Sequence, residues 1–158
     1  MTIIRAATPA DTATILGFVR ELAAFEREPD AVVATEPMLA EALFGPRPAA
    51  EAVIAERDGV PVGFALFFAN FSTWTGRQGL YLEDLYVTPS ARGGGVGKAL
   101  LIHLAGLARD RGWARFEWSV LDWNTPAVEF YRAMGAQAME EWTVQRVSGE
   151  ALARLAGR

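Results

Sequence analysis

A glycine-rich segment constrains this chain more than any other feature of its sequence. The segment reads ARGGGVGKAL, from Ala91 to Leu100, and it follows a β-prone run at residues 79–87. Beyond it, apolar residues recur at helical spacing as far as Gly112, which predicts an amphipathic helix. Glycines let backbone N–H groups approach an anion closely, and a helix N-terminus adds a favourable dipole. The segment therefore predicts a strand–loop–helix unit that binds phosphate, with a flexible loop entering a helix as the simpler alternative.

Two well-known phosphate-binding patterns do not fit this loop. A P-loop requires a glycine where Arg92 stands, five positions before Gly97, and a hydroxyl residue where Ala99 stands. The dinucleotide fingerprint Gly-x-Gly-x-x-Gly lacks its last glycine whether the pattern starts at Gly93 or at Gly95. The loop is therefore neither a nucleotide P-loop nor a dinucleotide fingerprint.

A third pattern does fit the loop. The pattern Arg/Gln-x-x-Gly-x-Gly/Ala follows a strand and opens a helix, and Arg92, Gly95 and Gly97 stand at its fixed positions. The side chains of Arg92 and Lys98 would add positive charge for a pyrophosphate group. Together with the strand before it and the helix after it, this pattern favours anion binding over a flexible loop.

Composition indicates a globular protein that uses neither cysteine nor a metal. The chain has 158 residues, of which 51% are hydrophobic and 22% are charged, so we expect a single domain over residues 1–158 with a sizeable core. It contains no cysteine, which excludes disulfides, thiolate nucleophiles and cysteine-bound metals. Its one histidine, His103, cannot form a multi-histidine metal site and is interpreted as a structural or surface residue.

Net charge and apolar runs bear on the partners of the protein. The formal net charge of −4 is unfavourable for binding nucleic-acid phosphates, which relies on Lys and Arg patches. It mildly favours cationic ligands, although a solvated acidic surface explains it equally well. The opening MTIIRAATPAD has no hydrophobic signal region, and no apolar run is long enough to span a bilayer. We therefore expect a cytoplasmic protein with no nucleic-acid and no membrane partner.

Hairpin strands come first in the chain, and an alternation of strands and helices follows. The strand patterns lie at residues 2–5, 52–56, 60–68, 79–87, 115–120 and 142–147. The helix patterns lie at residues 8–25, 35–45, 96–112, 124–134 and 150–155. The Asp58-Gly59 pair between the second and third strands is typical of a tight hairpin turn. This order predicts an α/β fold, a mixed sheet with helices on both faces.

Two longer segments resemble a known enzyme family. The segment YLEDLYVTPSARGGGVGKALL is similar to the acetyl-CoA-binding core of the GNAT acetyltransferases, and WNTPAVEFYRAMGA is similar to their later motif. Within that family, VRELAAFE, FSTWTG, YLEDLYV and EEW resemble, in the same order, the diamine (spermidine/spermine) and thialysine N-acetyltransferases. The resemblance extends over residues 5–146, nearly the whole chain.

The resemblance implies a mixed, mostly antiparallel central sheet, acetyl-CoA as the acetyl donor and a homodimer. In this family the strand at residues 79–87 splays away from the next one, so amides near Leu85 and Val87 would bind the pantetheine arm and the acetyl carbonyl. Asn124 would cap the following helix, hydrogen-bond the cofactor, or do both. The residues expected to bind acetyl-CoA are Leu85, Tyr86, Val87, Arg92, Gly93, Gly94, Gly95, Val96, Gly97, Lys98, Asn124, Pro126, Ala127 and Tyr131.

Two residues are expected to transfer protons. Glu83 lies in an apolar strand, where a carboxylate is costly unless it is paired or used, and the resemblance implies a base that deprotonates the attacking amine through water. Asp84 follows it on the opposite face, with a catalytic and a structural role both open. A salt bridge with Arg77 or Arg115 is the alternative for these carboxylates. Tyr131 is expected to protonate the departing CoA thiolate, with a packing tyrosine as the alternative.

Acidic and aromatic residues are expected to form the amine pocket, because an alkylammonium needs charge pairing and cation–π contact. The residues that the resemblance implies there are Phe25, Glu26, Trp74, Glu83, Asp84, Glu117, Trp118, Ser119, Glu140 and Glu141. A solvated turn is the alternative for the last two, and a core position is the alternative for Trp118.

Two departures from the subfamily bear on the substrate. Ser72 and Thr73 stand where an acid often precedes the tryptophan of FSTWTG, and Phe25 stands where a tyrosine is common. Both changes remove polar groups that could hold a distal ammonium, which argues against a long polyamine. We expect acetyl transfer to a small primary amine by direct attack. Acetylation of a protein lysine or N-terminus, and a non-catalytic acyl-CoA sensor, are the alternatives.

Overall fold

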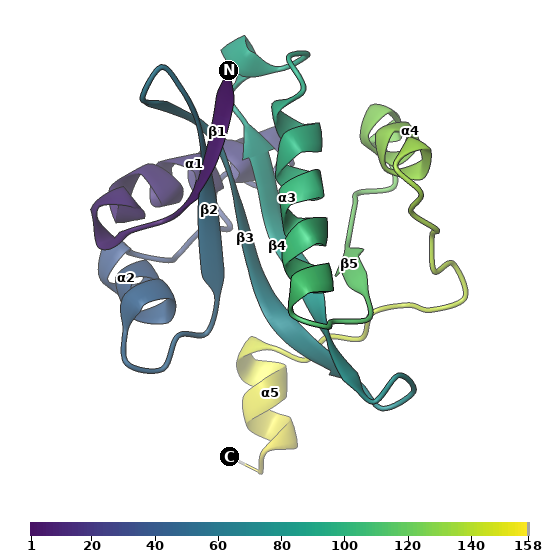
Figure 1. Ribbon diagram of the computed structural model, residues 1–158. Coiled ribbons are helices and arrows are strands. Elements are labelled where there is room, and N and C mark those ends of the chain that lie inside the picture. The colour runs from purple at the N-terminus through teal and green to yellow at the C-terminus, as the bar shows by residue number, and fades with distance from the viewer. Residues whose placement is uncertain (158) are drawn as a thin grey trace. The chain divides into compact units, whose positions relative to one another are not determined.

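A five-stranded sheet organises the first of two compact units in the computed structural model, which describes residues 1–157. This unit covers Met1–Ser119, and the second begins at Val120. The strands, in sheet order, are β1 (Thr2–Ala6), β2 (Glu51–Arg57), β3 (Val60–Ser72), β4 (Arg77–Val87) and β5 (Phe116–Trp118) (Figure 1). The first four pair antiparallel with their neighbours, and β4 and β5 pair in parallel. The predicted mixed, mostly antiparallel sheet is confirmed, while the single-domain organisation stays a prediction.

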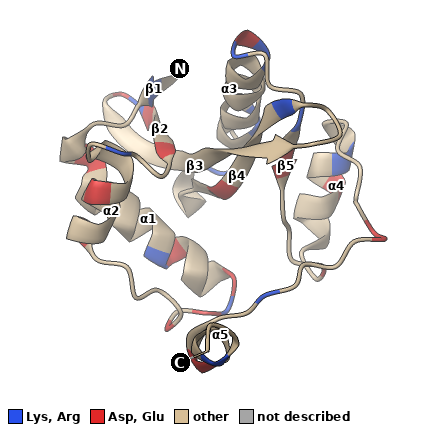
Figure 2. Ribbon diagram, turned by 90° about the horizontal axis from the view of Figure 1, so that it is seen from below, with Lys and Arg blue, Asp and Glu red and all other residues tan. Residues whose placement is uncertain are grey.

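Helices cover both faces of this sheet, as predicted. They are α1 (Thr12–Phe25), α2 (Glu36–Phe44) and α3 (Val96–Asp110), with short 3-10 turns at Pro9–Asp11 and Pro89–Ala91. Helices α1 and α2 lie on one face and α3 lies on the other (Figure 2). Under α1, Phe18 stacks on Phe64 with ring centroids 5.6 Å apart, and Tyr86 joins the same core. From α3, Leu100 and Leu104 are fully buried. Strand β4 thus packs under α1 on one face and beside α3 on the other, and the exposed glycine loop connects β4 to α3.

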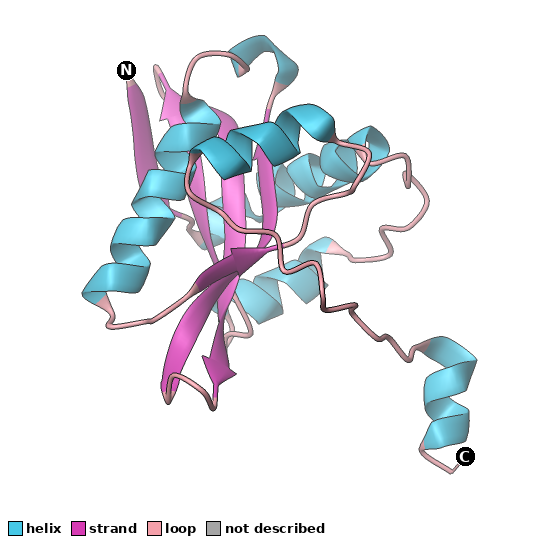
Figure 3. Ribbon diagram, turned by 90° about the vertical axis from the view of Figure 1, so that its right-hand side faces the viewer, coloured by secondary structure: helices cyan, strands magenta, loops and turns pink. Residues whose placement is uncertain are grey.

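The hairpin of β3 and β4 is longer than its sequence pattern predicts. The patterns end at residue 68 and begin again at residue 79, whereas pairing continues to Ser72 and Arg77. The end of the hairpin extends beyond the other strands of the sheet (Figure 3). Residues 51–57 form β2 up to the Asp58-Gly59 turn, where both φ angles are positive as the tight-turn pattern requires.

The second unit contains the helices α4 (Thr125–Ala133) and α5 (Gly149–Leu155). Asn124 caps α4, because its side-chain oxygen accepts a hydrogen bond from the Ala127 N–H at 3.4 Å. The strand predicted at residues 142–147 is wrong: these residues are exposed and irregular, and no strand of the described chain pairs with them. Strand propensity takes effect only through pairing with a neighbouring strand, and the sheet of the described residues does not include this segment. No helix among residues 1–157 has both the length and the apolar character needed to cross a membrane.

Candidate active site

Strand β4 separates from β5 halfway along its length. The two strands pair only where Leu80–Leu82 run beside Phe116–Trp118. On its other side, β4 continues to pair with β3 as far as Val87. Within the described residues, the edge of β4 that faces β5 is therefore open from Glu83 to Val87. This confirms the splayed strand that the sequence led us to expect.

The hydrogen-bond pattern shows which backbone groups face the open edge. Thr88 donates to the Val62 carbonyl at 2.8 Å, so Thr88 and the residues that alternate with it exchange hydrogen bonds with β3. Leu85 and Val87 lie between those positions, and their N–H and C=O groups point to the open edge. An extended ligand with amide groups could pair here as an added strand would. The amides near these two residues are the ones expected from the family resemblance to bind acetyl-CoA.

A β-bulge places Glu83 at the point where the two strands separate. Asp84 is opposite Leu66 and Leu82 is opposite Phe67, so Glu83 is an extra residue with no partner on β3. Its side chain is exposed. Bulges bend a strand and redirect a side chain, and they are frequent beside active sites. Glu83 therefore lies outside the regular pairing of β4 with β3, whereas Asp84 is within it.

Asp84 is partly buried among other acids. Burial, together with the nearby charges of Glu83 and Glu26, raises the pKa of Asp84 to about 6. Burial also raises the pKa of Glu26, which follows the last residue of α1. Neither Glu83 nor Asp84 forms an ion pair within the described residues, so the expected alternative of a salt bridge does not hold. A group of carboxylates without a counter-ion is an electrostatic site for a cation.

The glycine loop has the backbone of an anion site. Gly93 and Gly95 have φ angles of 79° and 82°, which residues with a Cβ rarely adopt. Gly95 is also the N-cap residue of α3. The first turn of a helix has no internal partners for its N–H groups. The residues in this turn are Val96, Gly97 and Lys98. The loop from Arg92 to Gly95 is exposed, so a ligand can reach these groups.

The side chain of Arg92 turns to the open edge of β4. Its Nε donates to the Val87 carbonyl at 3.0 Å, and its guanidinium lies 5.2 Å from the Phe25 ring centroid and 5.4 Å from that of Tyr86. The arginine thus connects the loop to the end of α1, where Phe25 is 45% exposed. Phe25, Glu26, Asp84 and the glycine loop are therefore parts of one region of the first unit.

Strand β5 brings three more of the expected pocket residues to β4. Glu117 accepts a hydrogen bond from the Asn70 side chain at 3.4 Å, and the Ser119 hydroxyl lies 3.0 Å from that of Tyr81. Trp118 is opposite Leu82, one residue before the bulge. These side chains adjoin the point where the strands separate, and Trp118 is partly buried rather than a core residue.

Trp74 lies at the end of the β3–β4 hairpin, away from Glu83 along the strand. It lies in the turn of the β3–β4 hairpin and is 81% exposed. Glu83 lies six positions after Arg77 along β4, which corresponds to roughly 20 Å at the usual rise of a strand. The role expected for Trp74 in the amine pocket therefore stays a prediction.

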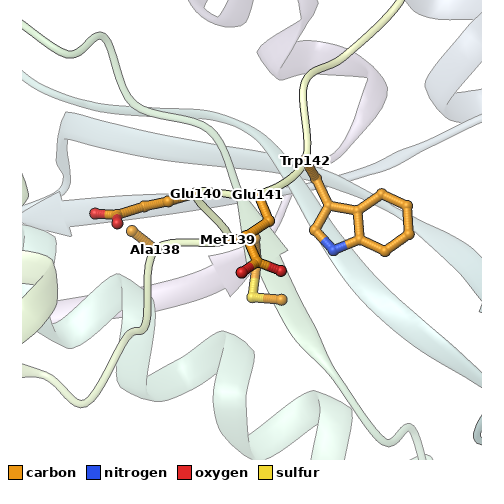
Figure 4. Close-up of a pocket in the computed structure, with 5 residues that line it drawn as sticks. All are labelled: Ala138, Met139, Glu140, Glu141 and Trp142. Carbon is orange, nitrogen blue, oxygen red and sulfur yellow. The ribbon is translucent and has the colours of Figure 1, made fainter.

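The remaining expected residues lie in the second unit. Pro126 and Ala127 belong to the first turn of α4 after its Asn124 cap, and Tyr131 lies on the same helix with its ring 5.5 Å from that of Phe130. A separate depression in this unit is lined by Ala138, Met139, Glu140, Glu141 and Trp142 (Figure 4). All five residues are exposed, and the side chains of the first glutamate and of the tryptophan point in different directions.

Comparison with known proteins identifies the family that this geometry belongs to. The family model described as "Acetyltransferase (GNAT) family" matches residues 18–136, which include the open edge of β4 and the glycine loop. The chain belongs to the GNAT acetyltransferase family. It is an N-acetyltransferase, and the resemblance inferred from its sequence motifs is confirmed.

Individual relatives of this GNAT protein cover nearly its full length. It is 40% identical to a thialysine N-epsilon-acetyltransferase of Sus scrofa, over 99% of this chain and 98% of that protein. It is 34% identical to an L-ornithine N5-acetyltransferase of Arabidopsis thaliana, over 94% of this chain and 85% of that protein. Among solved structures, an integron cassette protein from the mobile metagenome of V. cholerae has a TM-score of 0.83 at 28% identity, covering 99% of this chain and 98% of that one.

One contact of the GNAT loop is absent from the sequence-based expectations. Arg57, the last residue of β2, donates a hydrogen bond to the carbonyl of Gly94 at 2.8 Å. The two residues are 37 positions apart, and no local pattern connects a hairpin arginine with a glycine loop. Only the antiparallel order of β1 to β4 brings the end of β2 to the start of α3.

Proposed function

We propose that this enzyme transfers an acetyl group from acetyl-CoA to a small primary amine, such as a thialysine-like amino acid or a short diamine. The observation that carries this proposal is the acidic group of Glu26 and Asp84 beside the open edge of β4. A cationic amine would bind at the carboxylates while an acetyl donor occupies the edge. The names of the thialysine and ornithine acetyltransferases to which the chain is similar agree with such a substrate.

The residues of the first unit fit coenzyme A. Its pyrophosphate would receive hydrogen bonds from the N–H groups of the glycine loop and the first turn of α3. Its pantetheine arm carries amide groups, which match the open N–H and C=O groups of Leu85 and the open N–H group of Val87. When bound, the cofactor supplies an acetyl thioester. The N–H of Leu85 or Val87 would stabilise the negative charge that develops on the thioester oxygen. In the second unit, Asn124, Pro126 and Ala127 are proposed as further cofactor contacts.

In the proposed reaction, the amine nitrogen attacks the thioester carbon directly. A C–N bond forms and the C–S bond breaks. Glu83, exposed on its bulge, accepts the proton of the amine through water, and Tyr131 gives its proton to the departing thiolate. Asp84 and Glu26 hold the positive charge of the substrate. The chain has no cysteine, so a cysteine-bound acyl intermediate is excluded.

The amine substrate is best tested by thiol release from acetyl-CoA across a panel of amines. The panel contains putrescine, spermidine, spermine, thialysine, lysine, ornithine and a lysine-containing peptide. We expect turnover on a short diamine or amino acid, with spermine weaker, because Ser72 and Thr73 offer no carboxylate for a distal ammonium. Turnover on the peptide alone would instead indicate a protein acetyltransferase. Tight acetyl-CoA binding without turnover on any amine would indicate an acyl-CoA sensor.

The role of Glu83 as the base predicts a slower reaction with the amine. In Glu83→Gln we expect kcat/KM for the amine to fall by about 100-fold at neutral pH, since a general base contributes roughly 10²–10⁴-fold. Glu36→Gln, at an exposed position in the first turn of α2, is the matched control and should keep the wild-type kcat/KM. An unchanged kcat/KM in Glu83→Gln would remove this residue from the mechanism.

We further propose a homodimer, in which Trp74 would contact the amine pocket of the second copy. The support is the exposed end of the hairpin, where the large apolar side chains of Phe71 and Trp74 are 64% and 81% exposed. Light scattering should give the mass of two chains, and Trp74→Ala should raise the KM for the amine. A monomer with full activity would contradict this proposal. A cytoplasmic location and the absence of nucleic-acid partners stay predictions.

A further inference from the structure

Arg57 holds the glycine loop from outside through a fixed set of contacts. Its Nη2 donates to the Gly94 carbonyl at 2.8 Å, and its Nε donates to the Thr2 hydroxyl at 3.1 Å. The arginine is the last residue of β2 and is partly buried, so its side chain extends from a backbone that the sheet holds in place. The guanidinium is thus anchored on β1 by one bond and holds the loop by another.

The guanidinium lies directly against the Cα of Gly94. A Cβ added at this position would be 2.4 Å from Nη2 and 2.9 Å from Nη1 of Arg57. The φ angle of Gly94 lies outside the left-handed region, unlike those of Gly93 and Gly95. Gly94 therefore leaves room for the guanidinium of Arg57 beside its Cα, and a Cβ there would displace the end of that side chain. Gly93 and Gly95 are instead required for the positive φ angles of the loop.

Fixing the Gly94 carbonyl also fixes an amide on the other side of the loop. In a planar trans peptide, the C=O of one residue and the N–H of the next point in opposite directions. The bond from Arg57 to the Gly94 oxygen therefore directs the Gly95 N–H away from the arginine. Three successive glycines rotate more freely than other residues, so without this bond the peptide plane has little to hold it. A carbonyl turned toward a bound anion would repel it.

We infer that Arg57 is a positioning residue for the acetyl donor, which holds the glycine loop in its anion-binding conformation through the Gly94 carbonyl. This inference rests on the proposed function, in which the loop binds the pyrophosphate of acetyl-CoA. The role of Arg57 is to orient the peptide plane between Gly94 and Gly95. It extends the donor site to a strand that the family motif does not include.

The affinity of the full chain for CoA, measured by calorimetry, tests this role. Arg57→Ala should weaken CoA binding by about tenfold, the effect of one charge-assisted hydrogen bond. The KM for acetyl-CoA should rise by a similar factor, with kcat and the KM for the amine close to wild type. Arg111→Ala is the control, because Arg111, the residue after α3, donates two hydrogen bonds to the carboxylate of Glu51 at the other end of β2. Its CoA affinity should not change.

A double-mutant cycle separates positioning of the loop from a general loss of stability. Gly94→Ala leaves Arg57 in place but displaces its guanidinium, so we expect the same loss of CoA affinity as in Arg57→Ala. The combined variant should lose no more than either single variant, because both remove one interaction. Additive losses would overturn the inference. Because Gly94→Ala keeps the arginine, the test holds even if Arg57→Ala folds poorly.

A second ligand distinguishes loop positioning from direct contact with the ligand. 3′-Dephospho-CoA retains the pyrophosphate, so Arg57→Ala should weaken its binding by the same factor as that of CoA. A loss confined to CoA would show that Arg57 contacts the 3′-phosphate, and would overturn the positioning role. Unchanged CoA affinity in Arg57→Ala would also overturn it. Failure of the wild-type chain to bind CoA would overturn the proposed function itself.

Discussion

Tyr131→Phe is expected to slow acetyl transfer by about 100-fold in kcat, in line with the loss of a general acid. The substitution removes a single oxygen and keeps the ring that packs near Phe130. Without the hydroxyl proton, the thiolate must leave as an anion, which raises the barrier of the step that breaks the C–S bond. Binding does not depend on this proton, so the affinity for CoA should change less than threefold, well below the 1.4 kcal/mol that a tenfold change represents.

Thiol release at saturating acetyl-CoA and calorimetry with CoA measure the two quantities separately. Tyr81→Phe is the matched control, because it removes a hydroxyl from β4 together with its 3.0 Å contact to Ser119. Its kcat should remain within a factor of about two, since a hydrogen bond of this kind contributes only modestly. Equal turnover in wild type and Tyr131→Phe would show that the tyrosine is a packing residue, the alternative that its position beside Phe130 allows.

Asp84→Asn is expected to make the protein more stable at neutral pH and a poorer enzyme. The pKa of Asp84 is raised to about 6, from 3.8, chiefly by burial. Between these two values the folded chain keeps a proton that the unfolded chain releases, so stability falls as pH rises through this window. Above about pH 6 the full cost of the buried charge is present. The substitution removes this cost, which is about 1–3 kcal/mol for a shift of this size.

Thermal unfolding at several pH values tests the sign of this effect. Asp84→Asn should gain stability over wild type at pH 7–8 and little at pH 4, where the aspartate is largely neutral in the folded chain. Asp58→Asn is the control, because Asp58 is exposed in a turn with φ 51°, a conformation that asparagine also accepts. A variant that is less stable than wild type at pH 7 would contradict the raised pKa of Asp84.

The loss of activity in Asp84→Asn should appear in the KM for the amine. A charge pair in a partly buried site is strong, so we expect the KM to rise by about 10- to 100-fold. A site that gives up stability to keep an unpaired charge ready for a ligand is a common compromise in enzymes. An unchanged KM for every amine in the panel would assign Asp84 a structural role.

Local signals in the sequence predicted the helices well. The hydroxyl of Thr35 accepts the Met38 N–H at 3.3 Å at the start of α2, and Asn124 does the same for α4. Capping residues and the proline that follows them act within one turn, so their effect can be read without knowledge of the fold. The glycine loop is local in the same sense, since the φ angles of Gly93 and Gly95 are those of a tight turn into a helix.

Pairing between distant segments was predicted less well. Residues 142–147 were predicted to be a strand but belong to none of the strands in the described chain. The β3–β4 hairpin continues past its apolar pattern because its two strands pair with each other. The bulge at Glu83 depends on the register of two strands, which nothing near Glu83 encodes. Sequence alternation alone therefore could not show how differently Glu83 and Asp84 are exposed.

The family, the order of most elements and the residues that build the donor site could be predicted from local patterns, because motifs and caps act over a few neighbouring residues. How those residues act together depends on the folded arrangement of the chain. Three interactions connect residues that are far apart in the sequence. Asp84 is partly buried near Glu26, the guanidinium of Arg92 lies over the ring of Phe25, and Arg57 donates a hydrogen bond to the Gly94 carbonyl. Desolvation and hydrogen bonding depend on distances in space, and the folded sheet sets those distances.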